Sequence, residues 1–223
     1  MTRKVLTEQD VKSVPPGSPC YVEHGTILTP LAREIALQRQ NTIVECKSGE
    51  DLAELKSHER QIAIGADHNG WALKEQLKTF LQDNHYWIAD CGTHSPEVVD
   101  TLGLTVQVAS RVKEGKARWG IMIDGTGIGS CMVSNKVPGI RAAHCYDRFT
   151  AKSSREYTDS NLLTLGGLVV SFELATSITM TWLSTPFGKG EGHHSQVGKI
   201  REVEQRFVQC CVVAFPGDPY CAL

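Results

Sequence analysis

The stretch Gly120-Ile-Met-Ile-Asp-Gly-Thr-Gly-Ile-Gly129 is the most informative part of this chain. Ile121 to Ile123 form a short apolar run that ends in the carboxylate of Asp124, and three glycines follow within five residues. A short apolar run bounded by glycine is typical of a buried parallel strand, which we expect at 119–124. We expect a helix to begin near Gly127, because glycine-rich turns of this kind lead from a strand into a helix.

This turn is predicted to hold an anion beside a base. The backbone around Gly125, Gly127 and Gly129 and the hydroxyl of Thr126 would present donors near the start of the helix. Asp124 would stand at the carboxyl end of the strand, where open α/β sheets place their ligands. A carboxylate beside such donors can move a proton next to a carbonyl group while the donors stabilise the oxyanion. The alternative, a turn that only packs the helix closely on the strand, stays open.

Strands and helices alternate on both sides of this turn. The expected strands are 62–65, 87–90, 119–124, 140–145 and 162–165, and the expected helices begin near Gly70, Asp100, Gly127, Asp147, Phe172 and His194. Short strands separated by helices of about 10–15 residues favour a doubly wound parallel sheet with right-handed crossovers. We therefore expect one α/β domain over residues 61–207.

Residues 1–60 and 208–223 differ in character from this domain. The first form an N-terminal extension, and the second an apolar, cysteine-rich tail that is too short to fold alone and should pack on the body or on a partner subunit. The elements expected in the extension are a short helix capped by Thr7-Glu-Gln-Asp10, a helix from Thr29-Pro30 to about Arg39, a strand at 42–46 and a polar linker with some helical character at 47–60.

Composition excludes several classes of protein. The 223 residues carry a formal net charge of −2 and the basic residues are scattered, so no nucleic-acid partner is expected. No apolar stretch approaches the roughly 18–20 residues of a membrane span, so no membrane partner is expected either. The N-terminus lacks the apolar core of a secretory signal, which predicts a cytoplasmic location.

The cysteines and histidines do not predict a metal site. Most of the eight cysteines are single and widely separated, no Cys-x-x-Cys pair occurs, and the chain is large enough to fold without disulfides, so we expect reduced thiols. His193-His194 is better explained by a helix start or a subunit contact, because adjacent helical residues point in different directions. The glycine turn fits neither a Walker loop nor a dinucleotide loop. No metal and no cofactor is predicted.

A second polar pair follows the first strand expected in the α/β domain. Asp67-His68 comes directly after Ile62-Ala-Ile-Gly-Ala66 and precedes the helix expected near Gly70. Because parallel strands end at the same edge of a sheet, we expect Asp67, His68 and Asp124 to converge. Two interpretations stay open: Asp67 caps the helix and His68 fills a surface turn, or both act beside a substrate.

With these residues assembled, the chain resembles the family of type B ribose-5-phosphate isomerases and galactose-6-phosphate isomerase subunits. The resemblance covers about residues 61–202 in unbroken order, and its motifs are highly specific in combination. They are Gly65-Ala-Asp-His-Asn-Gly70, Asp90-Cys-Gly-Thr93, Gly120 to Gly129, Asn135-Lys-Val-Pro-Gly-Ile-Arg-Ala-Ala143, Ser154-Arg-Glu156 and Leu183-Ser-Thr-Pro-Phe187. The resemblance implies a three-layer αβα sandwich with a five-stranded parallel, Rossmann-like sheet. It also implies a homodimer or homotetramer with shared active sites and no metal.

The resemblance further implies a reaction in which an aldose phosphate and its ketose interconvert through an enediolate. One group opens the sugar ring, a base carries a proton between C1 and C2, and backbone donors hold the oxyanion. Carried over by position, Asp67 and His68 border the sugar, residues 125–129 bind the anion, and His193 is the histidine near the start of the last helix. We expect Asp124→Asn to abolish proton exchange at C2 and to leave the fold intact.

The chain departs from the family pattern at catalytic positions. The ribose enzymes commonly carry a cysteine base where this chain has Asp124, and a carboxylate whose proton affinity is raised by partial burial can take that role. In the segment Arg155-Glu-Tyr-Thr158, Tyr157 and Thr158 replace the ring-opening histidine and the asparagine beside it.

The chain also departs from the pattern where the family grips phosphate. Three arginine positions become Gly167, Gly192 and Gln196, so weak phosphate affinity is expected because charge-assisted contacts are stronger than neutral ones. The cations that could compensate are Lys189, Lys199, Arg148 and Arg155.

These residues favour two functions over a third, a nucleotide-binding module. The first is an aldose–ketose isomerase acting on ribose 5-phosphate or a related sugar phosphate, in which Asp124 is the base and His68 or Tyr157 assists ring opening. Thr158, His193 and Gln196 would border the substrate. The second is a non-catalytic sugar-binding or assembly protein that keeps the fold. Residues 26–33 resemble a segment in enzymes of bacterial microcompartments, which makes microcompartment components candidate partners.

Overall fold

The computed structural model describes most of the chain. The described residues are 4–14, 20–39, 41–46 and 60–210, with side chains described as far as residue 207. Residues 47–59 of the expected linker and 211–223 of the expected tail lie outside them. Within the described residues, no helix is long and apolar enough to cross a membrane.

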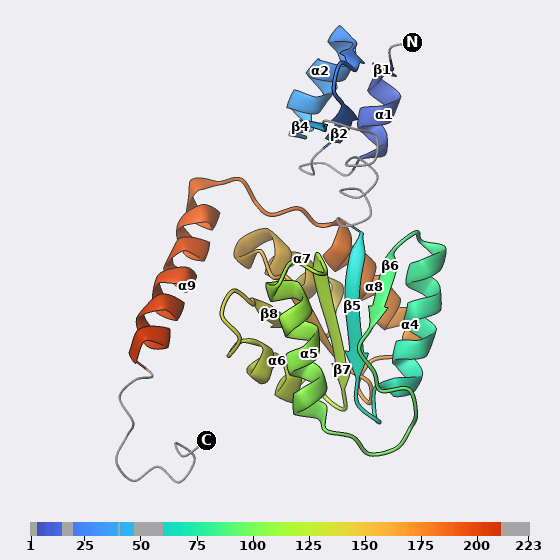
Figure 1. The fold of residues 1–223 in the computed structure, drawn as a ribbon, viewed down its shortest axis with the longest axis vertical. Helices are drawn as coiled ribbons and strands as arrows, with labels where there is room; N and C mark the ends of the chain where they lie inside the picture. Colours follow the sequence, from blue (N-terminus) through green and yellow to red (C-terminus); the bar gives the residue numbers. More distant parts are fainter. Residues whose placement is uncertain (1–3, 15–19, 40, 47–59, 211–223) are drawn as a thin grey trace.

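A five-stranded sheet organises residues 61–207, and all of its strands are parallel (Figure 1). Its order is β6-β5-β7-β9-β8, with bounds Trp87–Asp90, Gln61–Ala66, Trp119–Asp124, Leu162–Gly166 and Ala142–His144. The strand expected at 140–145 is shorter than predicted. Ile140 belongs to a turn in which its N–H donates to the carbonyl of Val137, and the N–H of Arg141 donates to the side-chain Oδ1 of Asn161 rather than to a strand carbonyl.

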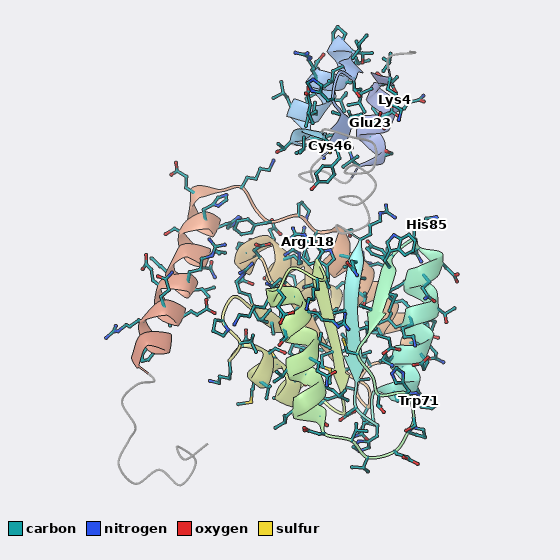
Figure 2. All side chains as sticks on the ribbon, in the orientation of Figure 1. Lys4, Glu23, Cys46, Trp71, His85 and Arg118 are labelled. Carbon is teal, nitrogen blue, oxygen red and sulfur yellow. The ribbon has the colours of Figure 1, made fainter. Side chains whose placement is uncertain are left out.

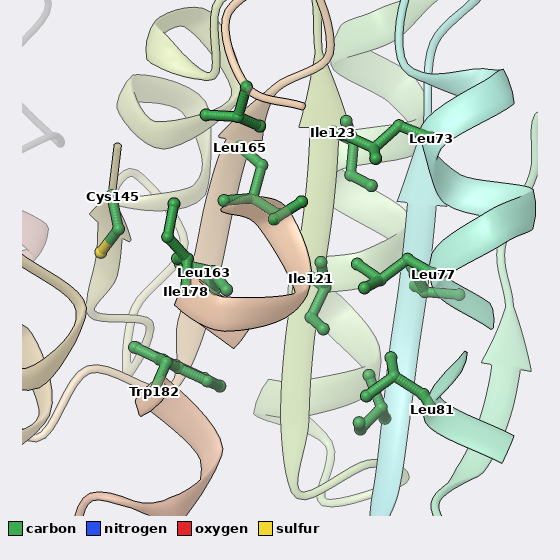
Figure 3. Packing of buried hydrophobic residues seen from close by; sticks show 14 of the residues in the cluster. Leu73, Leu77, Leu81, Ile121, Ile123, Cys145, Leu163, Leu165, Ile178 and Trp182 are labelled. Atoms are coloured by element: carbon green, nitrogen blue, oxygen red, sulfur yellow. The ribbon is translucent and has the colours of Figure 1, made fainter. Parts of the chain in front are cut away.

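Helices cover both faces of this sheet, which gives the predicted three layers. On one face lie α4 (Trp71–Asp83), α7 (Arg148–Thr158) and α8 (Phe172–Ser184), and on the other lie α5 (Thr101–Lys113) and α6 (Ile128–Ser134). Figure 3 shows leucines of α4 packed against Ile121 and Ile123 of β7, with Trp182 of α8 beside β9. The predicted fold class is confirmed.

Polar caps place most helix starts where the sequence predicts them. Asp100 accepts the N–H of Leu102 at the start of α5, and Asp147 accepts the N–H of Thr150 at the start of α7. The start expected at His194 is wrong, because α9 spans Glu191–Cys210. An acidic residue in the first turn suits the positive end of the helix dipole, so the helix begins at Glu191.

The N-terminal extension has a small core of its own, built from Val11, Ala32 and Ala36. Its helices are α1 (Glu8–Ser13) and α2 (Pro30–Gln38), as predicted from their caps, and its strands are β1 (Val5–Leu6), β2 (Cys20–Glu23), β3 (Ile27–Leu28) and β4 (Ile43–Cys46). The strands form two parallel pairs, β1 with β3 and β2 with β4. Figure 2 shows Lys4 and Glu23 close together in this unit, where they form an ion pair.

Candidate functional site

The candidate site lies where β5 and β7 end. The two strands are parallel neighbours, but the chain leaves them toward opposite sides of the sheet. After β5 it crosses to β6, and after β7 it crosses toward β9. Ligands of doubly wound sheets bind outside the carboxyl ends of the strands at such a switch point. The N–H of Asp67 donates to the carbonyl of Ile123 at 3.1 Å, and the N–H of Gly167 donates to that of Asp124 at 2.7 Å. The ends of three strands therefore meet here.

Asp67 serves as a structural cap and also joins a second helix to the site. The residue is 4% exposed, and its Oδ1 accepts the N–H groups of Asn69 and Gly70 at 2.9 and 3.0 Å, just before α4 begins. Its Oδ2 accepts the hydroxyl of Thr101, the first residue of α5, at 3.1 Å. The capping interpretation of Asp67 thus describes what its carboxylate does in this structure.

His68 lies beside this cap with one ring nitrogen free. Its Nε2 is 3.1 Å from the side-chain amide of Asn69. Its Nδ1 is buried and has no hydrogen-bond partner among the described residues. A buried, unpartnered ring nitrogen at a strand end can bind a ligand hydroxyl or carbonyl.

Asp124 is buried and its carboxylate is bound by the following turn. The residue is 5% exposed, and it accepts the N–H groups of Thr126 and Ser130, each at 2.8 Å, and of Gly127. Burial raises the pKa of Asp124, but hydrogen bonds from Ser130, Gly127 and Thr126 outweigh it and hold the pKa below its usual value. The carboxylate is therefore ionised at neutral pH.

This geometry corrects the expectation that the donors of residues 126 and 127 are open to a substrate. An aspartate before a turn readily accepts the N–H groups two and three residues later, which is what Asp124 does. Gly129 also lies against the carboxylate, since a Cβ at that position would be 3.7 Å from Oδ2. Gly125 faces Asn69 instead. Two donors of the predicted anion cradle, the N–H groups of Thr126 and Gly127, are therefore taken by the chain's own side chain.

A second group of predicted site residues lines a groove between α7 and α9. The groove has a volume of about 600 Å³ and is lined by Phe149, Thr150, Ser153, Ser154, Tyr157, Thr158 and Gln196, none of which is charged. The ring of His193 stacks edge-on against that of Tyr157, with 4.7 Å between centroids. Tyr157, Thr158, His193 and Gln196 therefore lie close together in this structure, and their role in binding a substrate stays a prediction.

The two groups lie at opposite edges of the sheet. Helix α7 begins after the carboxyl end of β8 and ends before the amino end of β9, so Tyr157 lies at the edge where strands begin. Figure 2 shows these edges: Trp71 follows the site residues at one end of the sheet, and Arg118 and His85 precede strands at the other. An 11-residue helix spans about 16 Å, so one chain does not bring Tyr157 to Asp124.

Arg155 cannot serve as a compensating cation for phosphate, which corrects that expectation. The residue is 4% exposed, and its guanidinium donates to Asp159 and to the carbonyl of Ser160, both at 2.7 Å. It also lies 4.4 Å from the ring centroid of Trp119. Arg148 is exposed and donates to Thr181 at 3.4 Å. Arg155 is thus part of the core, and Arg148 lies at the surface.

Several site residues are not evident from the sequence pattern. Ser130 binds Asp124 from the first turn of α6, and Thr101 binds Asp67 from α5. From the sequence, Lys74 would be expected to lie on the solvent-exposed face of a helix, yet it is fully buried beside Asp90. The expected helix start at Asp100 places Thr101 near the strand ends, but only tertiary packing identifies its partner. Among the described residues, no cluster of three or more metal-ligating side chains occurs.

Comparison with known proteins gives a consistent set of matches. The family model described as Ribose/Galactose Isomerase matches residues 62–200. Ribose-5-phosphate isomerase B of Escherichia coli (strain K12) is 38% identical over 147 residues, which cover 66% of this chain and 98% of the relative. D-erythrulose-4-phosphate isomerase of Pectobacterium atrosepticum is 37% identical over 152 residues, which cover 65% of this chain and 95% of the relative.

A solved structure agrees with these relatives. Ribose-5-phosphate isomerase B of Clostridium thermocellum matches with a TM-score of 0.64 and 45% sequence identity, covering 66% of this chain and 99% of that one. The residues matched by the family model, 62–200, include both groups of site residues.

Proposed function

We propose that this chain, which belongs to the ribose/galactose isomerase family, interconverts an aldose phosphate and its ketose through an enediolate. The observation that supports this most directly is the position of Asp124, an ionised carboxylate at the switch point between β5 and β7. The substrates we propose are ribose 5-phosphate and related short sugar phosphates.

Asp124 is the proton carrier in this proposal. Its Oδ1 accepts two backbone N–H groups, whereas Oδ2 accepts one, so Oδ2 has the greater remaining capacity to take a proton. In the aldose-to-ketose direction it would remove the proton from C2 of the open-chain sugar and return it to C1. Three N–H donors hold the carboxylate in one orientation, which favours a fixed approach to the carbon.

The oxyanion needs other donors, because Asp124 takes those of Thr126 and Gly127. The unpartnered Nδ1 of His68 and the hydroxyl of Thr126 are the groups we propose for it. The Thr126 hydroxyl oxygen accepts the N–H of Ile128 at 3.4 Å, and accepting this bond leaves the hydroxyl proton to donate to a ligand. Asp67 would keep the His68 backbone in place through its cap on α4.

A second copy of the chain would complete the site. Tyr157, Thr158 and Gln196 line a groove at the sheet edge opposite Asp124. A two-fold dimer can bring that groove of one copy against the Asp124 edge of the other. Tyr157 would then assist ring opening across the interface. The groove is uncharged, so phosphate contributes less to binding than it would against arginines.

The N-terminal unit is proposed as an assembly element. Val11, Ala32 and Ala36 form a core separate from that of the α/β domain, and the matched relatives are covered almost completely without the N-terminal unit. Microcompartment components are the partners that the resemblance of residues 26–33 favours.

A substrate panel tests the proposed function. The full chain is incubated with tetrose, pentose and hexose aldose phosphates, ketose formation is followed by proton NMR, and binding is measured by calorimetry. Turnover of at least one phosphate supports the proposal. Binding without turnover would instead favour a non-catalytic sugar-binding protein, and no binding at all would favour an assembly role.

A further inference from the structure

A buried lysine binds the segment that joins β6 to α5 next to the candidate site. Lys74 of α4 is 0% exposed, and its Nζ donates to Asp90 Oδ1 at 2.8 Å and Oδ2 at 3.0 Å. The same ammonium donates to the backbone carbonyl of Thr93 at 2.7 Å. Asp90 is the last residue of β6, and Thr93 lies in the β6–α5 segment, residues 91–100.

This segment is bound to the site at both of its ends. At the first end, the N–H of Thr93 donates to the carbonyl of Ala66, and the N–H of Ala66 donates to that of Gly92, both at 2.7 Å. Ala66 immediately precedes Asp67-His68. At the other end, the segment leads into Thr101, whose hydroxyl binds Asp67. A shift of Thr93 would therefore be transmitted directly to Asp67 and His68.

Stability alone does not account for an ammonium at this position. Replacing a buried ion pair by well-packed apolar residues is often neutral or stabilising. An ammonium, however, has three donors and can bind a carboxylate and a main-chain carbonyl at the same time, which no apolar side chain can do. The hydrogen bonds also act on the partner: burial raises the pKa of Asp90, but Lys74, Lys78 and the N–H of Gly92 bring it down to about 2.

We propose that Lys74 is a positioning residue for the isomerisation: through Thr93 it fixes the β6–α5 segment and the Asp67-His68 end of β5 around the substrate. This inference rests on the proposed function. Lys78 provides a matched comparison, because it also binds Asp90 and Glu75 from α4 but makes no described contact with Thr93.

The test compares Lys74→Met and Lys78→Met in the full chain. Both variants lose an ion pair with Asp90, so both are expected to unfold at a lower temperature. At a temperature well below unfolding, Lys74→Met is expected to lower kcat at least about tenfold with little change in KM, as small misplacements near reacting atoms do. Lys78→Met is expected to keep kcat within about twofold. Hydrogen exchange at Ala66 and Thr93 should rise only in Lys74→Met.

Two outcomes would overturn the inference: equal losses of kcat in the two variants, or unchanged exchange at Thr93 in Lys74→Met. A wild-type chain without isomerase activity contradicts the proposed function, and the exchange data then decide the anchoring role by themselves. If Lys74→Met does not fold, Lys74→Arg keeps the charge and is expected to show the same pattern with smaller effects.

Discussion

Asp124 is the proposed base and also stabilises the local fold, and the two roles can be separated. Its carboxylate accepts three N–H groups that otherwise have no acceptor at the start of α6. The sequence alone predicts the carboxylate at the strand end, but not that its own turn would bind it. The expectation that Asp124→Asn leaves the fold intact therefore needs revision, because the Asn amide places a donor opposite one of these N–H groups.

The Asp124→Asn variant is predicted to lose activity and some stability. Loss of a general base lowers kcat by about 10²–10⁴-fold. The unsatisfied N–H group costs about 1–3 kcal/mol of unfolding free energy, measured by urea denaturation. Asn84→Ala is the control: it removes the side-chain bond to Phe80 that ends α4 at the far edge of the sheet, so it should lose stability but keep kcat. Equal kcat in wild type and Asp124→Asn would remove Asp124 from the mechanism.

Asp90 gives a prediction about acid stability. Its pKa is about 2 in the folded chain, below the ordinary value of 3.8. A depressed folded pKa contributes stability that is present above about pH 4 and is lost as the pH falls through 2. The difference in unfolding free energy between wild type and Asp90→Asn should therefore shrink by about 2 kcal/mol between pH 5 and pH 2. A difference that stays constant over that range would show that Asp90 titrates normally.

At the scale of elements, the glycine turn explains which parts of the site the sequence could predict. Gly127 has φ of +80°, and a Cβ there would lie 2.5 Å from Nδ1 of His144 and 2.9 Å from the backbone of Leu165. The need for glycine is readable from the sequence, because the spacing of residues 125–129 indicates a tight turn. The contact with His144 cannot be predicted from the sequence, because it depends on how β8 and β9 pair.

Gly127→Ala should therefore cost more than backbone strain alone. Gly115 is the matched control, since its φ is +68° and a Cβ there would meet nothing within 4 Å. We expect Gly115→Ala to lose about 1 kcal/mol of unfolding free energy, as left-handed strain costs. Gly127→Ala adds a clash with His144 and should lose at least about 2 kcal/mol more, together with activity. Similar losses in the two variants would mean that the turn tolerates a side chain.

The strands and Arg155 also show that local sequence predicts some features, whereas others depend on tertiary packing. The runs at 87–90 and 119–124 match their observed strands because apolar periodicity and flanking polar residues mark both ends. The run at 140–145 extends beyond its strand because Ile140 is buried in a turn, and burial alone does not distinguish the two. Arg155 would likewise be expected to face solvent, and only the packing of Trp119 and Trp182 around it shows that it is buried.

In the whole molecule, the two groups of site residues lie far apart, so two inactive variants should restore activity when they are mixed. If each site combines Asp124 of one copy with Tyr157 of another, a mixture of inactive Asp124→Asn and Tyr157→Ala chains refolded together contains some intact sites. Random pairing into dimers leaves about a quarter of the sites intact. Activity should recover to about that fraction of wild type, as a coupled assay of ketose formation would show. No recovery on mixing would place both groups in one chain or exclude Tyr157 from the reaction.

An enzyme that moves a proton between neighbouring sugar carbons by way of an enediolate exposes that proton to exchange with solvent, so a reaction in D₂O reports on this step. Ribose 5-phosphate is incubated with the full chain in D₂O, and the signal of the proton on C2 is followed by NMR. With the wild-type chain this signal should disappear as deuterium enters and ribulose 5-phosphate forms, and neither should happen with Asp124→Asn. Ketose formation without any deuterium uptake in repeated turnover would contradict an enediolate intermediate. Deuterium uptake at an unchanged rate in Asp124→Asn would contradict Asp124 as the base.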